Sequence, residues 1–167
     1  MINANDRLPR AWKIRSEYQK LCKGSSKSYS SVLHYPVKNI KVDFSRRQIE
    51  SEIRSAYVDS SEQQISAHIG QIFLALNHVK PNDLIVIPKN KGKLFTIGVV
   101  EEVPQISLDG NISFQFSMKR KDIPLSLFDQ DLRYSFMAIM KICEVTRNNA
   151  AERLIAISNG NDDPGFL

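Results

Sequence analysis

The strongest constraint on the fold is a change of hydrophobic period near the middle of the chain. Residues 83–88 and 94–100 are short runs rich in β-branched and aromatic side chains, and the five residues 89–93 join them. Two such runs on either side of a short, glycine-containing connection are typical of a β-hairpin. Residues 112–118 then alternate apolar and polar side chains, which predicts a third antiparallel strand beside the hairpin.

Two segments before the hairpin have helical spacing instead. Apolar residues recur about one turn apart between residues 45 and 57, and Ser45 stands at capping-box distance from the glutamine three positions later. A second apolar stripe runs through residues 60–78, where Ser60 or Ser61 can cap the helix. We therefore expect two consecutive helices ahead of the hairpin.

The remaining segments are shorter. Asn149 and Glu152 stand at capping-box spacing for a closing helix. Together the segments predict an α+β domain with a curved, mainly antiparallel sheet that forms a pseudo-barrel with flanking helices. The predicted segments are strands at 11–15, 32–37 and 139–145, helices at 127–136 and 150–157, and a loop or fraying helix at 16–31.

A chain of 167 residues is long enough for one domain with its own core and too short for two well-developed ones. Residues 1–10 are predicted to be a flexible lead-in and residues 11–157 the domain itself. Residues 158–167 are rich in Asn, Asp, Gly and Pro, which is typical of a linker-like tail.

The apolar runs of the chain are short. They fall far below the roughly 18 residues that a membrane-spanning helix needs, and charged residues interrupt any signal-like start. Cys22 and Cys143 have no CxxC spacing, which suits a reducing compartment. We expect a cytoplasmic protein without a membrane partner.

The sequence lacks the common catalytic and metal-binding motifs. His34, His68 and His78 do not have zinc-ligand spacing, and no Glu-x-Lys follows a candidate aspartate as a PD-(D/E)xK nuclease requires. Gly92 and Lys93 lack the first glycine of a phosphate loop. We therefore expect a non-catalytic protein without metal or cofactor, although sequence alone leaves a serine or cysteine nucleophile open.

Basic residues gather in two segments of a chain whose net charge is +5. A positive surface attracts polyanions, and cations along one rim of a barrel would follow a phosphate backbone. For either cluster alone, ordinary solvation of a surface turn is the alternative. The clusters are Lys89, Lys91 and Lys93 at the hairpin tip, and Lys119, Arg120 and Lys121 at the end of the third strand.

Aromatic residues could provide stacking faces for a base. Trp12, which precedes Arg15 on the first strand, is one candidate, and Tyr35 and Phe95 are the others. Proteins that read an unstacked or flipped nucleotide commonly stack it on such rings. Packing in the core is the alternative for all three rings, and it is strongest for Phe95. We predict a base pocket formed by these four residues.

Several segments resemble a known family. Residues 83–88 and 96–100 are similar to its "GDLVVLP … IAIGxVTG" strands, and residues 12–15 to its opening "WVIR" strand. Residues 121–136 and 147–153 are similar to its "xDIPRSxFxQDLLYSFGA … RNNAExRI" signature. These patterns belong to the N-terminal domain of Mrr-like restriction proteins.

The resemblance implies a PUA-like or EVE-like pseudo-barrel that presents DNA, with or without modified bases, to a C-terminal or partner nuclease domain. The chain departs from the family pattern in three places: Asn82 replaces the usual glycine, residues 34–36 are His-Tyr-Pro where the family has "IGW", and Leu125 replaces an arginine. The leading hypothesis is a non-catalytic, DNA-binding specificity domain of a restriction or phage-defence nuclease. The alternative is a protein-interaction domain that controls a nuclease without contacting DNA, with residues 131–134 in the docking surface.

Overall fold

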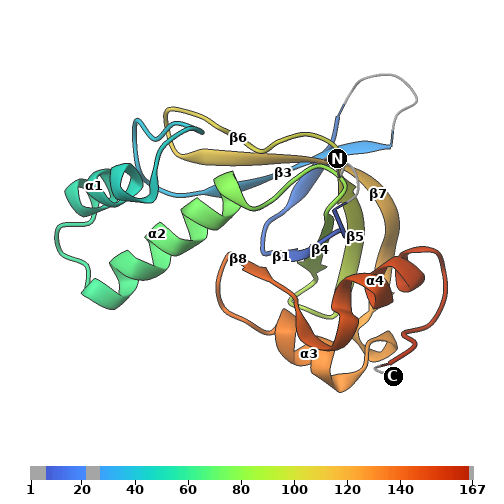
Figure 1. Ribbon diagram of the computed structural model, residues 1–167. Coiled ribbons are helices and arrows are strands. Elements are labelled where there is room, and N and C mark those ends of the chain that lie inside the picture. Colours follow the sequence, from blue (N-terminus) through green and yellow to red (C-terminus); the bar gives the residue numbers. More distant parts are fainter. Residues whose placement is uncertain (1–6, 22–26, 166–167) are drawn as a thin grey trace.

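The computed structural model describes residues 7–21 and 27–165, which form an α+β fold (Figure 1). Its helices are α1 (Arg46–Ala56), α2 (Glu62–Asn77), α3 (Gln130–Phe136) and α4 (Ala150–Ser158), with short 3-10 turns η2 (Leu125–Leu127) and η3 (Arg147–Asn149). Its strands are β1 (Ala11–Ile14), β2 (Tyr18–Lys20), β3 (Ser28–His34), β4 (Leu84–Lys89), β5 (Leu94–Val100), β6 (Gln105–Ile106), β7 (Asn111–Pro124) and β8 (Ile142–Glu144).

The strands form one curled sheet in the order β2-β3-β7-β5-β4-β1-β8, and β6 pairs with β7 beside this path. Most neighbours are antiparallel, including the predicted β4–β5 hairpin and the third strand β7. The pair β1–β4 is parallel. The predicted α+β class with a curved, mainly antiparallel sheet is therefore confirmed, and the sheet has the shape of a half-barrel.

Both faces of the central strands are covered. Helices α1 and α2 lie on one side of the sheet and α3 and α4 on the other (Figure 1). All four residues of β1 are consequently buried. Lys13 is buried as well, because the loop after α3 covers this side of β1 and its carbonyls accept hydrogen bonds from the ammonium.

The start of each of the first two helices follows the predicted capping pattern. The Ser45 hydroxyl accepts a hydrogen bond from the backbone N–H of Gln48, and Ser61 caps α2 in the same way. The predicted capping box at Asn149 is wrong. Asn149 has a left-handed conformation and its side chain makes no capping bond, whereas a capping residue needs an extended backbone.

The other segments differ from the predictions mainly at their ends. Residues 16–31, expected to be a loop or fraying helix, instead contribute β2 and the start of β3, which pair with each other. The last predicted strand shortens to β8, and the predicted helix at 127–136 starts at Gln130. Residues 1–6 of the predicted lead-in, Cys22, and residues 166–167 of the predicted tail lie outside the described residues.

Candidate functional site

A cavity of about 520 Å³ lies between the tip of the β4–β5 hairpin and helix α3. The end of β1, the hairpin, η2, and α3 with the loop after it all contribute to its wall, so distant parts of the chain meet there. Its lining consists of Arg15, Pro88, Lys91, Gly92, Phe95, Leu125, Arg133, Phe136, Met137 and Ala138.

Aromatic rings form the apolar floor of this cavity. The Phe95 and Phe136 side chains are buried, and their ring centroids lie 5.0 Å apart. Both rings also contact the ring of Phe128, at centroid distances of 5.3 and 4.9 Å. The floor is therefore part of the packed core, which holds its shape.

The hairpin tip places a lysine at the rim. Asn90, Lys91 and Gly92 are successive residues with positive φ angles of 50°, 54° and 79°. The backbone N–H of Gly92 donates to the Lys89 carbonyl at 3.1 Å, and that of Leu125 donates to the Lys93 carbonyl at 3.0 Å. These bonds close the turn and tie it to η2. Lys91 lines the cavity as a result.

The rim is positively charged. Arg15, Lys91 and Arg133 line the cavity, and none of its described lining residues carries a carboxylate. The guanidinium groups contact neutral carbonyls: Arg15 Nη1 donates to the Ile139 carbonyl at 3.1 Å, and Arg133 Nε to that of Phe128 at 2.5 Å. Among the described residues none of the three cations forms an ion pair. An anion would therefore be attracted to this rim.

Of the four residues predicted to form a base pocket, only Arg15 and Phe95 line this cavity. The Trp12 ring is buried, with its Nε1 donating to Oδ2 of Asp83 at 2.9 Å. Tyr35 is likewise buried and donates its hydroxyl proton to Oε1 of Gln71 at 3.0 Å.

Trp12 and Tyr35 are therefore core residues and do not line a base pocket. Both rings belong to the core layer that packs against α1 and α2, because that layer covers one face of the central strands. Burial also raises the pKa of Tyr35, so its hydroxyl stays protonated at neutral pH. Neither ring offers a face to a base.

The predicted backbone-binding lysines of the hairpin are all exposed. Lys91 reaches the cavity, whereas the Lys89 ammonium lies 4.2 Å from the centre of the Tyr18 ring. Lys93 follows the tip and begins the return towards β5. The three side chains therefore surround the outer end of the hairpin.

The second predicted cluster lies on the strand next to the hairpin. In the β5–β7 pairing Leu94 is opposite Pro124 and Ile97 is opposite Arg120. Lys119 and Lys121 are exposed. The cluster borders a smaller cavity of about 220 Å³, lined by Lys27, Tyr29, Met118, Lys119, Arg120 and Lys121. The two basic clusters thus lie along neighbouring strands.

Arg120 differs from its neighbours because its guanidinium is occupied. Its Nη1 donates to the carbonyls of Ile157 at 2.9 Å and Asn161 at 3.2 Å, at the C-terminal end of α4. A register shift between Ile97 and Gly98 sends Arg120 to the α4 side of the sheet. This side chain stabilises the end of a helix, where a positive charge is favourable.

The residues of the family-like signature in the second half of the chain contact one another. Arg153 is buried, with a side chain 3% exposed, and it donates to both carboxylate oxygens of Asp131 at 2.6 and 3.0 Å. It also donates to Asp163 at 2.8 and 2.7 Å, and Asn148 Nδ2 donates to Asp131 at 2.9 Å. These bonds hold the pKa of Asp131 well below its usual range. The signature therefore fixes α3, η3 and α4 together, and it ties residue 163 of the predicted linker-like tail to them.

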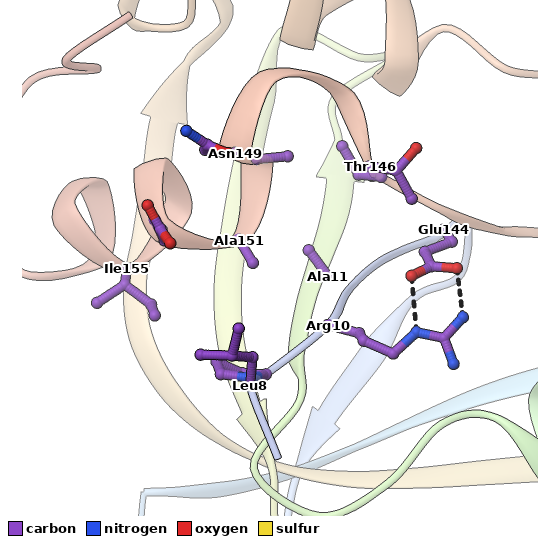
Figure 2. Close-up of a pocket in the computed structure, with 12 residues that line it drawn as sticks. Leu8, Arg10, Ala11, Glu144, Thr146, Asn149, Ala151 and Ile155 are labelled. Atoms are coloured by element: carbon purple, nitrogen blue, oxygen red, sulfur yellow. Dashed lines mark hydrogen bonds and ion pairs between the residues drawn. The ribbon is translucent and has the colours of Figure 1, made fainter. Parts of the chain in front are cut away.

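A third cavity, of about 280 Å³, lies between the segment leading into β1 and helix α4 (Figure 2). Ala151 and Ile155 of the helix face Leu8, which is exposed. At one side Arg10 forms a two-point ion pair with Glu144, with Nε–Oε1 and Nη2–Oε2 distances of 2.7 and 2.5 Å. Its charged lining residues, Arg10, Glu144 and Glu152, have both signs, whereas those of the cavity at the hairpin tip are all cations.

Seven lining residues of the hairpin-tip cavity were not predicted for the base pocket or the backbone-binding clusters: Pro88, Gly92, Leu125, Arg133, Phe136, Met137 and Ala138. Arg133 and Phe136 stand three positions apart on α3, a spacing that puts two side chains on one helix face, and this spacing could have identified them. Met137 and Ala138 follow the helix and carry no comparable signal.

No family model, curated protein or solved structure matches this chain. Within the part of the chain that the structure describes, none of the helices combines the length and apolar character needed to cross a membrane. In the same residues, no three His, Cys, Asp or Glu side chains gather in an arrangement that could hold a metal ion.

Proposed function

We propose that this chain is a DNA-binding module that takes an unstacked base into the hairpin-tip cavity and holds the phosphate backbone with the cations around it. The observation that carries this proposal is the lining of the cavity, whose described residues provide an aromatic floor and three cations but no carboxylate. This combination suits a planar apolar group that is attached to an anion, which is the chemistry of a nucleotide.

The dimensions of the cavity support this proposal. Its volume of about 520 Å³ is within the range of typical small-ligand pockets, roughly 300–1,000 Å³. Phe95 and Phe136 provide the apolar surface on which a base can rest, while Arg15 and Lys91 can donate charge-assisted hydrogen bonds to phosphate oxygens.

The neighbouring lysines extend the positive surface beyond the cavity. Lys89 and Lys93 at the hairpin are exposed, and so are Lys119 and Lys121 on β7, the strand that pairs with β5. Cations spread in this way can contact several phosphates of a duplex, which fixes its register without reading its sequence. We infer that base selection belongs to the cavity and affinity to the lysines.

The biological setting of this activity rests on the resemblance to the N-terminal domain of Mrr-like restriction proteins. On that basis the module is a non-catalytic specificity domain of a restriction or phage-defence nuclease, and modified bases are candidates for its ligand. The DNA would be handed to a nuclease domain, attached or separate.

A titration tests the proposal. Fluorescence anisotropy of modified and unmodified duplexes at two salt concentrations should give binding that weakens steeply with salt, because bound cations displace counterions from DNA. The double variant Arg15→Gln, Lys91→Gln should bind at least tenfold more weakly. The matched control Lys38→Gln, Lys41→Gln removes two exposed charges beside α1 and should bind normally. Undetectable or salt-insensitive binding by the unaltered chain would contradict the proposal.

The apolar groove of Figure 2 favours a second candidate, a protein-interaction module that controls a nuclease. Exposed Leu8 beside Ile155 is the kind of surface that a protein partner covers. The predicted docking segment 131–134 offers less, because Leu132 is buried and Asp131 is bound to Arg153. For this candidate, Ile155→Glu should abolish association with an Mrr-type nuclease domain and leave DNA affinity unchanged.

A further inference from the structure

The loop between α3 and β8 exposes large apolar side chains next to the hairpin-tip cavity. Met137, Ile139 and Met140 are 71%, 85% and 44% exposed. Met137 and Ala138 also line the cavity, so one end of the loop forms its lip. Closely spaced exposed apolar residues at one edge of a cavity are typical of a contact surface.

Hydrogen bonds from β1 and from Arg15, the residue after it, hold the backbone of this loop. Lys13, which is buried, donates through Nζ to the Ala138 carbonyl and to that of Met140 at 2.9 Å. Arg15 donates through Nη1 to the Ile139 carbonyl at 3.1 Å and through its backbone N–H to that of Lys141 at 2.8 Å.

Four consecutive carbonyl oxygens of the loop, those of residues 138–141, therefore accept hydrogen bonds from β1 and Arg15. With the backbone fixed in this way, the apolar side chains at 137, 139 and 140 stay on the outside. The loop therefore projects in a fixed conformation. The conformational entropy of ordering it is lost when the protein folds and not when a ligand binds.

The charges around the projection indicate what it meets. Arg15 and Arg133 flank it at the cavity, and Lys141 follows it, with its ammonium donating to the His34 carbonyl at 2.7 Å. Apolar side chains bordered by cations suit a polyanion that has an apolar interior. In duplex DNA that interior is the base stack, and proteins insert Met, Ile or Leu side chains between base steps while cations contact the flanking phosphates.

We propose that Met137 and Ile139 form a wedge that enters the base stack of a duplex beside the cavity, opens one base step and so exposes the base that the cavity receives. This inference rests on the proposed function and adds to it the means by which a base leaves the stack. It also assigns Lys13 as a positioning residue that holds the loop.

A duplex carrying 2-aminopurine beside a mismatched pair is the probe, since its fluorescence rises when the base unstacks and a mismatch lowers the cost of unstacking. Binding is followed separately by anisotropy. The unaltered chain should raise the fluorescence several-fold at saturation. The variant Ile139→Ser, which leaves the cavity lining intact, should bind within about fivefold of normal and lose most of this rise.

The control variant Val58→Ser, Leu108→Ser removes two other exposed apolar side chains and should keep both signals. Circular dichroism and thermal unfolding establish that each variant is folded. Duplex binding without a fluorescence rise, or an undiminished rise in the wedge variant, overturns the wedge and leaves the proposed function standing. Absence of duplex binding by the unaltered chain overturns both. Loop-dependent binding to anionic phospholipid vesicles, with no unstacking of the duplex, assigns the loop to a lipid surface and also overturns the wedge.

Discussion

Two arginines near helix α3 illustrate two uses of the same side chain. Arg153 is buried and meets carboxylates of its own chain, those of Asp131 and Asp163. Arg15 lies at the rim of a cavity and contacts only a neutral carbonyl through its side chain. The first charge is balanced inside the protein, whereas the second remains available to an external anion.

This contrast teaches that the partners of a cation, and not its presence, separate a structural role from a binding role. A buried ion pair that loses one member leaves an uncompensated charge in the core, which is costly to stability. An exposed cation that is lost costs stability little, but it removes an attraction for the ligand. The two arginines should therefore respond to mutation in opposite ways.

The largest expected effect is on folding. Arg153→Met should lower the free energy of unfolding by about 3–5 kcal/mol, because it strands buried Asp163 and partly buried Asp131 without their partner. Urea denaturation at pH 7 measures this loss. Arg15→Met serves as the comparison and should cost less than about 1 kcal/mol. Equal losses in the two variants would contradict the contrast.

The pH dependence of stability tests the structural role of the contact between Arg153 and Asp131. The hydrogen bonds from Arg153 lower the pKa of folded Asp131 below its unfolded value of about 3.9, so its stabilisation is present above that pH and lost as pH falls through the folded pKa. Asp131→Asn should cost roughly 2–3 kcal/mol at pH 7. Denaturation curves at descending pH should show the gap to the unaltered protein narrowing below about pH 4. A gap that is constant down to pH 2 would assign the loss to packing.

The cavity side of the comparison is tested by binding. Arg15→Gln should weaken DNA binding about tenfold, or about 1.4 kcal/mol, with little change in unfolding free energy. Anisotropy titrations and urea denaturation on the same preparation give both values. A variant that loses stability but keeps its affinity would place Arg15 with Arg153 as a structural residue.

The smallest effects separate two adjacent residues of β7. Arg120→Gln should lower the free energy of unfolding by about 0.5–1 kcal/mol through loss of the α4 carbonyl contacts, and leave DNA affinity nearly unchanged. Lys119→Gln should do the reverse, with a roughly twofold loss of affinity. Calorimetry measures the stability of the two variants, and anisotropy measures their DNA affinity. Identical behaviour of the two variants would remove the distinction between occupied and exposed cations.

Local patterns made much of the fold predictable. The capping boxes of Ser45 and Ser61, the β4–β5 hairpin and strand β7 depend on neighbours in sequence, which a sequence displays directly. Burial of Lys13 depends instead on a loop more than a hundred residues later in the sequence. The carbonyl oxygens of this loop accept hydrogen bonds from the Lys13 ammonium. Such long-range coverage leaves no trace in the hydrophobic period of β1.

The candidate site was half predictable for the same reason. Arg15 and Phe95 were identified by residue type, but Trp12, which is also aromatic, lies where the layer of α1 and α2 covers it. Arg133 and Phe136 join the cavity only because α3 packs over the hairpin tip. Which cations face carboxylates and which face a cavity is decided by this packing.

The salt dependence of DNA binding tests the central claim most directly. The logarithm of the affinity should fall linearly with the logarithm of the salt concentration, and the Arg15→Gln, Lys91→Gln variant should have a slope smaller by about 2, since each lost phosphate contact removes close to one unit. Lys38→Gln, Lys41→Gln should keep the original slope. If both variants have the slope of the unaltered chain, the cations at the cavity do not hold DNA and the account is contradicted.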